Sequence, residues 1–327
     1  MNLKTIVTKK IGDIPRKDWD SVFPKVIEGY DFYKTLDESQ FEQFSFYYIV
    51  VYDNESAVGA APCFSMRYSL DTSISGSSRR ILNYIKKFAP NIFSVKALIC
   101  GMPMGRGQIG IAEGKEGGKI VEAILRKMQE IARDEKTKLI AFKDFPHGYK
   151  DAFKILIENG FFIVDGLPYA EMDLTFKTFE DYLKKLSGST RYDLRRKFKK
   201  VDCCVKIDMN IVDDLEGDLL AEVYKLYLQM LDKHEMTFEI VPIEFFKNTP
   251  KNMPKRTKFF LWYVDNKLAA FLFCMVSDDV MMDYFLGLDY ALAHKYHLYF
   301  IKHRDVMKWC IENGIKRYEI GFSGYEL

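Results

Sequence analysis

The sequence predicts an α/β chain of two tandem domains, each built on a mixed, mainly antiparallel sheet flanked by helices. Two observations carry this prediction. Strand-like apolar runs alternate with helix-like runs along the chain. One order of elements, a hairpin followed by a helix and a strand, occurs twice. A length of 327 residues suits two domains of ordinary size.

The two hairpins are the clearest part of the repeat. In the first, apolar runs over 46–52 and 57–65 flank the turn at Asp53-Asn54. In the second, runs over 259–264 and 267–277 flank Asp265-Asn266. An Asp-Asn pair between two apolar runs is typical of a hairpin turn. We therefore expect one such hairpin in each domain.

The later elements follow both hairpins in the same order. Helices are expected over 118–133 and 299–313, and strands over 138–142 and 316–320. The connection is longer in the first copy, which predicts an insertion near 67–95, where serines cluster. We expect the domain boundary at Leu167-Pro168, giving domains of 1–167 and 168–327.

The remaining elements are assigned in chain order. The first domain is expected to hold strands over 5–8, 96–100 and 161–164, and helices near 18–23, 30–38 and 149–159. A strand over 169–174 could join either sheet. The second domain is expected to hold a helix over 179–200 broken at Ser187-Gly188, a helix over 213–233, a short helix from Pro242 and a strand over 280–286.

Composition excludes several classes of function. Hydrophobic residues at 48% exclude general disorder, and a formal charge of +2 gives no overall attraction to DNA or to a membrane. No apolar run approaches the length of a membrane span, and the N-terminus lacks a signal-peptide pattern. The six cysteines have no CxxC spacing and are expected as small buried side chains in a reducing compartment. These features predict a cytoplasmic protein.

A basic segment over 184–200 is the strongest local concentration of charge, with eight basic residues against one acid. A helix is expected to start at Thr190 and to place Arg191, Arg195 and Lys199 on one face. The opposite, buried face would hold Leu194, Phe198 and Val201. The segment is either an anchor for the phosphates of a nucleotide-bearing donor or of RNA, or a solvated helix face.

A glycine-rich loop, Gly105-Arg-Gly-Gln-Ile-Gly110, formally satisfies the GxGxxG pattern. Its following helix starts late and Pro103 disturbs the tight turn, so a dinucleotide fingerprint is weakly supported. The loop could hold a phosphate on its backbone N–H groups, or it could be an ordinary flexible loop.

Polar residues embedded in apolar strands are the candidates for proton transfer. Asp283 and Tyr284 lie within the run over 280–286, and Glu319 and Tyr325 lie in or just after the last strand. A buried acid is costly unless it is paired, so each is either a structural hydrogen-bonding group or a group with a shifted pKa. Strand alternation puts Asp283 and Tyr284 on opposite faces. The histidines at 294, 297 and 303 lack the spacing of a metal site, and no metal is expected.

Two segments accompany the duplication. They are Phe179-Glu-Asp-Tyr-Leu-Lys-Lys-Leu-Ser-Gly-Ser-Thr-Arg-Tyr-Asp-Leu-Arg-Arg-Lys197 and the ending Gly314-Ile-Lys-Arg-Tyr-Glu-Ile-Gly-Phe-Ser-Gly-Tyr-Glu326. Together these features resemble the FemAB-like N-acyltransferases, tandem-domain members of the GNAT superfamily. The resemblance implies an enzyme, an acyltransferase that moves an acyl or aminoacyl group from acyl-CoA or aminoacyl-tRNA to an amine. The acceptor would be a small molecule or a cell-envelope precursor.

The resemblance also implies roles for particular residues. Backbone at a splayed strand would hold the donor carbonyl, and the start of the next helix would hold its pyrophosphate. The matching positions are Phe285, Leu286, Gly287, Leu288 and His297, with Arg191, Arg195 and Lys199 as phosphate contacts. Asp283 or Glu319 would be the base, and Tyr284 or Tyr325 the acid.

Two departures from the family pattern bear on these expectations. The stretch over 287–294 lacks the glycine-rich pyrophosphate loop of coenzyme A users, which keeps aminoacyl-tRNA open as the donor. The sequence stops at Leu327 where relatives continue, so the second domain is expected to be truncated. The alternative from another class is a non-catalytic binding protein that recognises RNA or an anionic ligand through the helix over 190–200.

Overall fold

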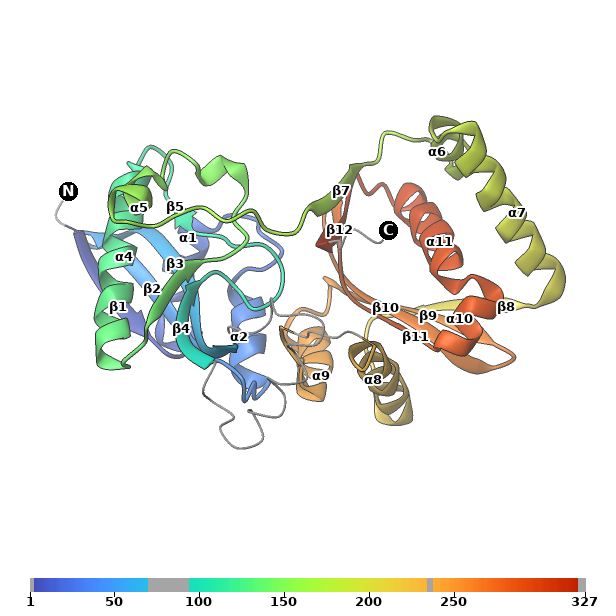
Figure 1. Ribbon diagram of the computed structural model, residues 1–327, viewed down its shortest axis with the longest axis horizontal. Helices are drawn as coiled ribbons and strands as arrows, with labels where there is room; N and C mark the ends of the chain where they lie inside the picture. Colours follow the sequence, from blue (N-terminus) through green and yellow to red (C-terminus); the bar gives the residue numbers. More distant parts are fainter. Residues whose placement is uncertain (1–2, 70–93, 234–237, 323–327) are drawn as a thin grey trace, which may run out of the picture. The chain divides into compact units, whose positions relative to one another are not determined.

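The computed structural model describes residues 3–69, 94–233 and 238–322. The chain forms two compact units. Unit 1 comprises Met1–Gly166 with Phe238–Val241, and unit 2 comprises Leu167–Thr237 with Pro242–Leu327. Each unit has its own sheet (Figure 1). Each also has its own hydrophobic core.

Unit 1 is a mixed sheet of order β1-β2-β3-β4-β6, with β5 paired to β3. The strands are β1 (Leu3–Thr8), β2 (Ser45–Asp53), β3 (Ser56–Ser69), β4 (Ser94–Cys100), β5 (Gly110–Ile111) and β6 (Leu139–Phe142). The helices are η1 (Ile11–Asp13), α1 (Arg16–Val22), α2 (Tyr30–Glu38), α4 (Gly117–Asp134), η3 (His147–Tyr149) and α5 (Lys154–Glu158). β4 and β6 are parallel, and the other paired strands are antiparallel.

Helices cover both faces of the unit 1 sheet. The apolar stripe of α4 packs against one face, where Ile49 and Leu98 are fully buried. On the other face Trp19 of α1 and Tyr33 of α2 contact Tyr48, with ring centroids 5.8 and 5.6 Å from it. Because side chains alternate along β2, this strand contributes to a hydrophobic core on each face of the sheet.

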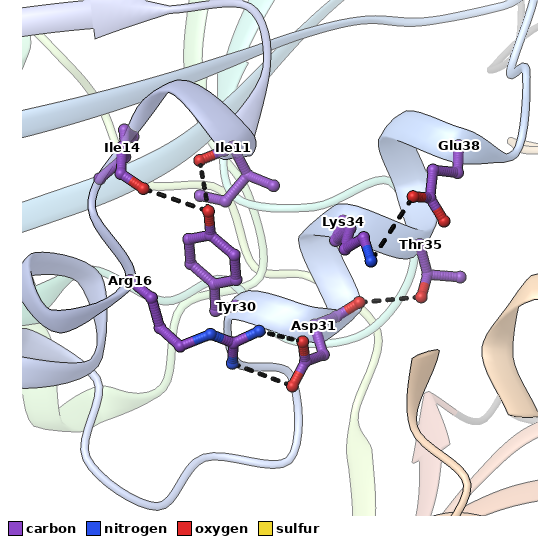
Figure 2. Close-up of polar contacts among 8 residues, drawn as sticks. All are labelled: Ile11, Ile14, Arg16, Tyr30, Asp31, Lys34, Thr35 and Glu38. Carbon is purple, nitrogen blue, oxygen red and sulfur yellow. Dashed lines mark hydrogen bonds and ion pairs between the residues drawn. The ribbon is translucent and has the colours of Figure 1, made fainter. Parts of the chain in front are cut away.

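A polar cluster fixes α2 to the segment before α1 (Figure 2). Arg16 forms a bidentate ion pair with Asp31, and its guanidinium lies 4.4 Å from the ring centroid of Tyr30. The Tyr30 hydroxyl lies 3.1 Å from the carbonyl oxygens of both Ile11 and Ile14, to which it donates. The cluster is structural, because each charge in it is satisfied within unit 1.

Unit 2 is a mixed sheet of order β7-β12-β11-β10-β9-β8. The strands are β7 (Tyr169–Asp173), β8 (Ile207–Val212), β9 (Thr257–Val264), β10 (Lys267–Ser277), β11 (Val280–Leu288) and β12 (Arg317–Phe322). The helices are α6 (Phe179–Lys185), α7 (Gly188–Cys204), α8 (Gly217–Leu231), α9 (Ile243–Asn252), α10 (Tyr290–Tyr296) and α11 (Leu298–Glu312). β11 and β12 are parallel, and the other pairs are antiparallel.

Two helical layers also sandwich the unit 2 sheet. On one face α6, α7 and α11 share a core that includes Leu194 and Ile301. On the other face Tyr227 of α8 and Phe246 of α9 pack on Phe285 of β11, with ring centroids 5.4 and 5.7 Å from it. No helix in the described ranges is long and apolar enough to cross a membrane.

The predicted fold class and both hairpins are confirmed, but the turn of the first hairpin is Asn54-Glu55, one residue later than predicted, because Asp53 still pairs with Ser56. In the second hairpin Asp265 and Asn266 both adopt positive φ, which is the conformation of a type I′ turn. The repeated helix and strand are α4 with β6 in unit 1 and α11 with β12 in unit 2. Most of the expected insertion near 67–95 lies outside the described residues, since β3 reaches Ser69 and β4 begins at Ser94.

Several predicted elements were wrong. No strand forms over 161–164, where Phe162 is 84% exposed, because an apolar run by itself supplies no neighbouring strand to pair with. The helix over 149–159 is shortened to η3 and α5. Helix α7 starts at Gly188 rather than Thr190, since the Ser187 hydroxyl accepts from the Thr190 N–H and caps it. Strand β8 was missed, although Ile207 to Val212 alternates in burial.

The segment Phe238–Val241 was not expected in unit 1. The ring centroid of Phe238 lies 6.4 Å from that of Phe44 and 6.3 Å from that of Phe64. The N–H of Ile240 donates to Oε1 of Gln43 at 2.9 Å. Aromatic packing and one backbone hydrogen bond therefore hold this segment in unit 1.

Candidate functional site

The parallel strands of unit 2 separate part way along their length. β11 and β12 pair at three positions, the last of which joins Met282 to Glu319. Beyond that pair β11 stays paired with β10 as far as Leu288, and β12 stays paired with β7 as far as Phe322. We call this parting the β11–β12 divergence. Among the described strands, none lies beside this part of the β11 backbone on the β12 side.

A bulge interrupts each strand at the level of the divergence. The register between β10 and β11 skips Tyr284, and the register between β12 and β7 skips Ile320. An extra residue bends a strand and increases its twist. Two bulges at one level therefore explain why the strands part there.

Unit 1 has no such parting in its described residues. β4 and β6 pair over four positions, ending with Cys100 and Phe142, and the N–H of Lys143 still donates to the carbonyl of Cys100 at 3.0 Å. The two units thus differ at the equivalent parallel strand pair. The candidate site therefore lies in unit 2.

The glycine-rich loop of unit 1 is packed against its own unit. The N–H of Gly107 donates to the carbonyl of Asp144 at 3.1 Å, and the N–H of Ile109 donates to the hydroxyl of Tyr149 at 3.1 Å. A Cβ at position 107 would lie 2.1 Å from the carbonyl oxygen of Lys143. Close packing therefore accounts for Gly107, and two of the loop's N–H groups are not available to a phosphate.

Asp283 is buried on the face of the sheet that α11 covers. Its Oδ2 accepts a 2.6 Å hydrogen bond from the Tyr318 hydroxyl and lies 3.4 Å from Nζ of Lys302, while its Oδ1 has no partner among the described residues. Burial raises the pKa of Asp283, and Lys302 and Tyr318 oppose the rise. The Asp283 side chain is 9% exposed, and its contacts with Tyr318 and Lys302 link β11 to β12 and to α11.

Glu319 and Tyr284 lie on the other face. Glu319 pairs with Met282 and so points away from the face of Tyr318; the Tyr169 hydroxyl donates to its Oε2 at 2.7 Å. Tyr284 follows Asp283 and so points to the opposite face, where the ring centroid of Phe273 is 5.7 Å away. The structure therefore brings Glu319 and Tyr284 to one face, on either side of the divergence, and separates Asp283 from them. Tyr325 lies outside the described residues.

The expected carbonyl-binding stretch can offer a ligand mainly its backbone. Phe285 is buried in the aromatic cluster of α8 and α9, and Leu286 and Leu288 pack on the core below α11. A Cβ at Gly287 would lie 2.2 Å from the Phe271 ring and 2.9 Å from the backbone of α8. The glycine is thus required by helix packing.

The two helices after β11 differ in what their first turns can bind. The Asp289 carboxylate caps α10 by accepting from the Leu292 N–H at 3.2 Å, and it pairs with Lys267 at 2.7 Å. His297 adopts φ 52° between α10 and α11. Burial lowers the pKa of His297, and the charges of Lys200 and Lys197 lower it further. The start of α11 is therefore the more electropositive of the two.

The predicted basic face of α7 is partly engaged within unit 2. Arg191 donates to the Lys184 carbonyl at 3.2 Å, and Arg195 pairs with Glu180 at 2.6 Å. Lys199 has no carboxylate within ion-pair distance among the described residues. Lys197 belongs to the predicted basic segment but was given no role. Its Nζ pairs with Asp193 at 2.7 Å and lies 3.7 Å from the ring centroid of Phe300 in the first turn of α11.

Sequence reasoning also missed Lys302, although a signal was present. Leu298, Lys302 and Val306 form one i, i+4 stripe of α11, and all three are buried. A lysine in an apolar helix stripe and an aspartate in an apolar strand are each costly alone. Their coincidence in one domain could have indicated a buried pair.

A family model named FemAB-like and described as peptidoglycan biosynthesis and recognition matches residues 10–326. No curated protein matches the sequence. The crystal structure of FemX is 11% identical, with 99% of this chain and 90% of that chain covered and a TM-score of 0.58.

Two further solved structures share the fold. The C-terminal domain of a putative lysylphosphatidylglycerol synthetase from Agrobacterium fabrum is 13% identical, covering 94% of this chain and 77% of that chain, with a TM-score of 0.53. A tandem GNAT protein from the clavulanic acid biosynthesis pathway is 10% identical, with 100% of this chain and 91% of that chain covered and a TM-score of 0.51. At these identities the likenesses concern the fold, and they confirm the tandem GNAT-like arrangement. With nearly its whole length matched by the family model, the chain belongs to the FemAB-like family.

Proposed function

We propose that this protein transfers an acyl or aminoacyl group from an activated donor to an amine, and that the β11–β12 divergence of unit 2 holds the donor. The observation that carries the proposal is the placement of Glu319 and Tyr284 on one face, on opposite sides of strand backbone without a neighbour. Membership of a family described by peptidoglycan biosynthesis supports a cell-envelope amine as acceptor.

The transfer assigns one role to each group. The amine nitrogen attacks the donor carbonyl carbon, and Glu319 accepts the proton that the nitrogen loses. Backbone N–H groups of β11 stabilise the charge that develops on the carbonyl oxygen. As the bond from that carbon to the leaving sulfur or ribose oxygen breaks, Tyr284 supplies the leaving atom with a proton. Tyr169 holds the Glu319 carboxylate in place through its hydrogen bond.

The charges beyond β11 bear on the choice of donor. The Asp289 carboxylate already caps α10, and a second negative group at that helix start would be repelled. The start of α11, beside Lys197 and Lys200, is the better place for a donor phosphate. This arrangement favours an aminoacyl-tRNA over a coenzyme A thioester whose pyrophosphate would need the start of α10.

Calorimetric titration tests the proposal directly. The protein is titrated with acetyl-CoA, a long-chain acyl-CoA and charged tRNA, each at two salt concentrations. Saturable tRNA binding that weakens steeply with salt supports aminoacyl transfer. Saturable coenzyme A binding supports an acyl-CoA transferase. No binding of any donor would favour the non-catalytic alternative. Lys197→Glu should weaken donor binding, and Lys225→Glu on α8 should leave it unchanged.

A further inference from the structure

A groove in unit 2 lies apart from the β11–β12 divergence. It has a volume of about 850 Å³ and is lined by residues of α6, α7 and α11 and the segment just before α6. This volume is in the range of small-molecule sites. Lys308, on its α11 side, is ten residues from the helix start at Leu298, which corresponds to about 15 Å along the helix. The groove is therefore separate from the proposed position of the donor phosphates.

The floor of the groove is apolar. Leu183 and Phe198 line it and are 1% and 9% exposed, and Phe179 and Ile311 are partly buried beside them. The ring centroids of Phe179 and Phe198 are 6.1 Å apart. The apolar surface still open to solvent belongs to Phe179 and Ile311, and covering it with an apolar ligand body gains roughly 25 cal/mol per Å² removed from water.

Positive charge surrounds this floor. Two of the lining arginines are already neutralised, because Arg195 pairs with Glu180 and Arg304 pairs with Asp202. The lining lysines are Lys177, Lys199 and Lys308, and none has a carboxylate within ion-pair distance among the described residues. Of the three acids that line the groove, Glu180 and Asp202 are in these pairs, and Glu312 has no basic side chain within ion-pair distance in the part of the chain that the structure describes. The groove keeps a net positive charge after its internal pairs are counted.

We propose that this groove binds a small organic anion, a carboxylate or monophosphate carried on an aromatic or branched aliphatic body. The anionic group meets Lys199 and Lys308, and the body covers Phe179 and Ile311, which lie beside the buried Leu183 and Phe198. An inorganic anion would leave the apolar surface of Phe179 and Ile311 in contact with water. A nucleic acid backbone is less suited, because its phosphates are spaced along an exposed strand and do not cover an apolar floor. This inference does not depend on the proposed transferase activity.

Anilinonaphthalene sulfonate, an aromatic anion whose fluorescence rises in apolar sites, is the first probe. We expect saturable binding to the folded protein and displacement by benzoate or phenyl phosphate, whose relative potency distinguishes a carboxylate site from a phosphate site. Lys199→Glu and Lys308→Glu should each weaken binding of the probe about threefold to tenfold. Lys225→Glu, an exposed lysine on α8 outside the groove, is the charge-matched control.

The chain also contains its own reporter of the groove. Cys203 is exposed and lines the groove; its neighbour Cys204 is exposed but does not line it, and the other four cysteines are buried. In Cys204→Ser protein, Cys203 should react faster with the anionic aromatic reagent dithiobis(nitrobenzoate) than Cys204 does in Cys203→Ser protein. Lys199→Glu should remove this advantage. Neutral dithiodipyridine should react with Cys203 at similar rates in Cys204→Ser protein and in Cys204→Ser protein that also carries Lys199→Glu.

The outcomes separate the groove from its alternatives. Partial unfolding raises fluorescence of the naphthalene probe, so a loss of signal in Lys199→Glu identifies loss of the site. Equal probe binding by Lys199→Glu, Lys308→Glu and Lys225→Glu would overturn the proposal. Displacement by a short RNA with steep salt dependence, and by neither small anion, would replace it with a nucleic acid surface.

Discussion

The hydroxyl of Tyr318 on β12 donates a 2.6 Å hydrogen bond to Asp283 on β11, immediately beyond the last registered pair of the two strands. Lys302 of α11 lies 3.4 Å from the same carboxylate oxygen and is 3% exposed. A buried carboxylate with a donor from one side and a cation from another resists displacement. We infer that this side-chain tie sets where the strands begin to part.

The first prediction concerns the Asp283–Lys302 pair. Asp283→Leu leaves a buried ammonium without its partner, and Lys302→Met leaves a buried carboxylate with one donor fewer. Each single change should lower the free energy of unfolding by about 3–5 kcal/mol, whereas the double change should cost much less than the sum. Urea unfolding measures all three, with Lys225→Met as the surface control. Additive costs would contradict a direct coupling.

The second prediction concerns His303 and acid stability. Burial, with the charge of Lys302, lowers the pKa of His303 to about 4, and its Nε2 lies 3.1 Å from the Tyr182 hydroxyl. Since the unfolded state binds this proton below about pH 6.5, the contribution of His303 is present above that pH and is lost as pH falls toward 4. The loss is at most about 1.4 kcal/mol per pH unit.

His303→Gln should therefore flatten the decline of stability between pH 6.5 and 4, when unfolding is followed in urea at several pH values. His294 is exposed and supplies the control substitution His294→Gln. If the wild-type and His303→Gln curves run parallel over this window, the histidine is already charged in the folded state.

The third prediction has the opposite sign and belongs to unit 1. Burial raises the pKa of Asp37 to about 6, although Tyr48 and the Ile11 N–H both donate to its carboxylate. A raised carboxyl pKa contributes stability below the unfolded value, near 4, and that contribution is lost as pH rises through 6. The stability of Asp37→Asn relative to wild type should thus be higher at pH 7 than at pH 4.

Hydrogen exchange resolved by peptide can measure the Asp37 effect in unit 1 alone. Asp165→Asn, at an exposed position of the same unit, is the matched control. A difference between wild type and Asp37→Asn that does not vary from pH 4 to pH 7 would show that Asp37 titrates normally.

Local signals were sufficient for much of the fold, and their limits are physical. The hairpins were predictable because Asp265 and Asn266 tolerate the positive φ of the turn. The β11–β12 divergence was not predictable, because the bulges at Tyr284 and Ile320 arise from strand pairing, which leaves no local pattern in the sequence. Likewise, the presence of Lys197 at the start of α11 depends on how two helices pack. Asp283, Tyr284 and Glu319 could be selected as polar residues in or near apolar strands, but which of them share a face could not be deduced, because that depends on the register between β11 and β12.

The fourth prediction compares two glycines. Gly287→Ala places a Cβ 2.9 Å from the backbone of α8, so it should destabilise unit 2 by about 1–3 kcal/mol. Gly118→Ala in the first turns of α4 meets nothing within 4 Å and should stabilise unit 1 by about 0.5–1 kcal/mol. Thermal unfolding measures both. A neutral Gly287→Ala would mean that α8 can move away from β11, and that the glycine is kept for another reason.

The last prediction tests the roles at the divergence, with whichever donor binds. Glu319→Gln keeps the shape and can still accept from Tyr169, but it cannot take a proton from the amine. It should lower kcat about 10²- to 10⁴-fold and leave the donor Kd unchanged. Tyr284→Phe keeps the ring beside Phe273 and should lower kcat most for the donor with the poorer leaving group.

Glu222→Gln, which changes an exposed glutamate on α8, is the control and should retain wild-type kinetics. Because Asp283 lies on the opposite face, Asp283→Asn should not reproduce the Glu319→Gln effect. A larger loss of kcat in Asp283→Asn than in Glu319→Gln, with donor binding and fold intact, would transfer the role of base from one face of the sheet to the other.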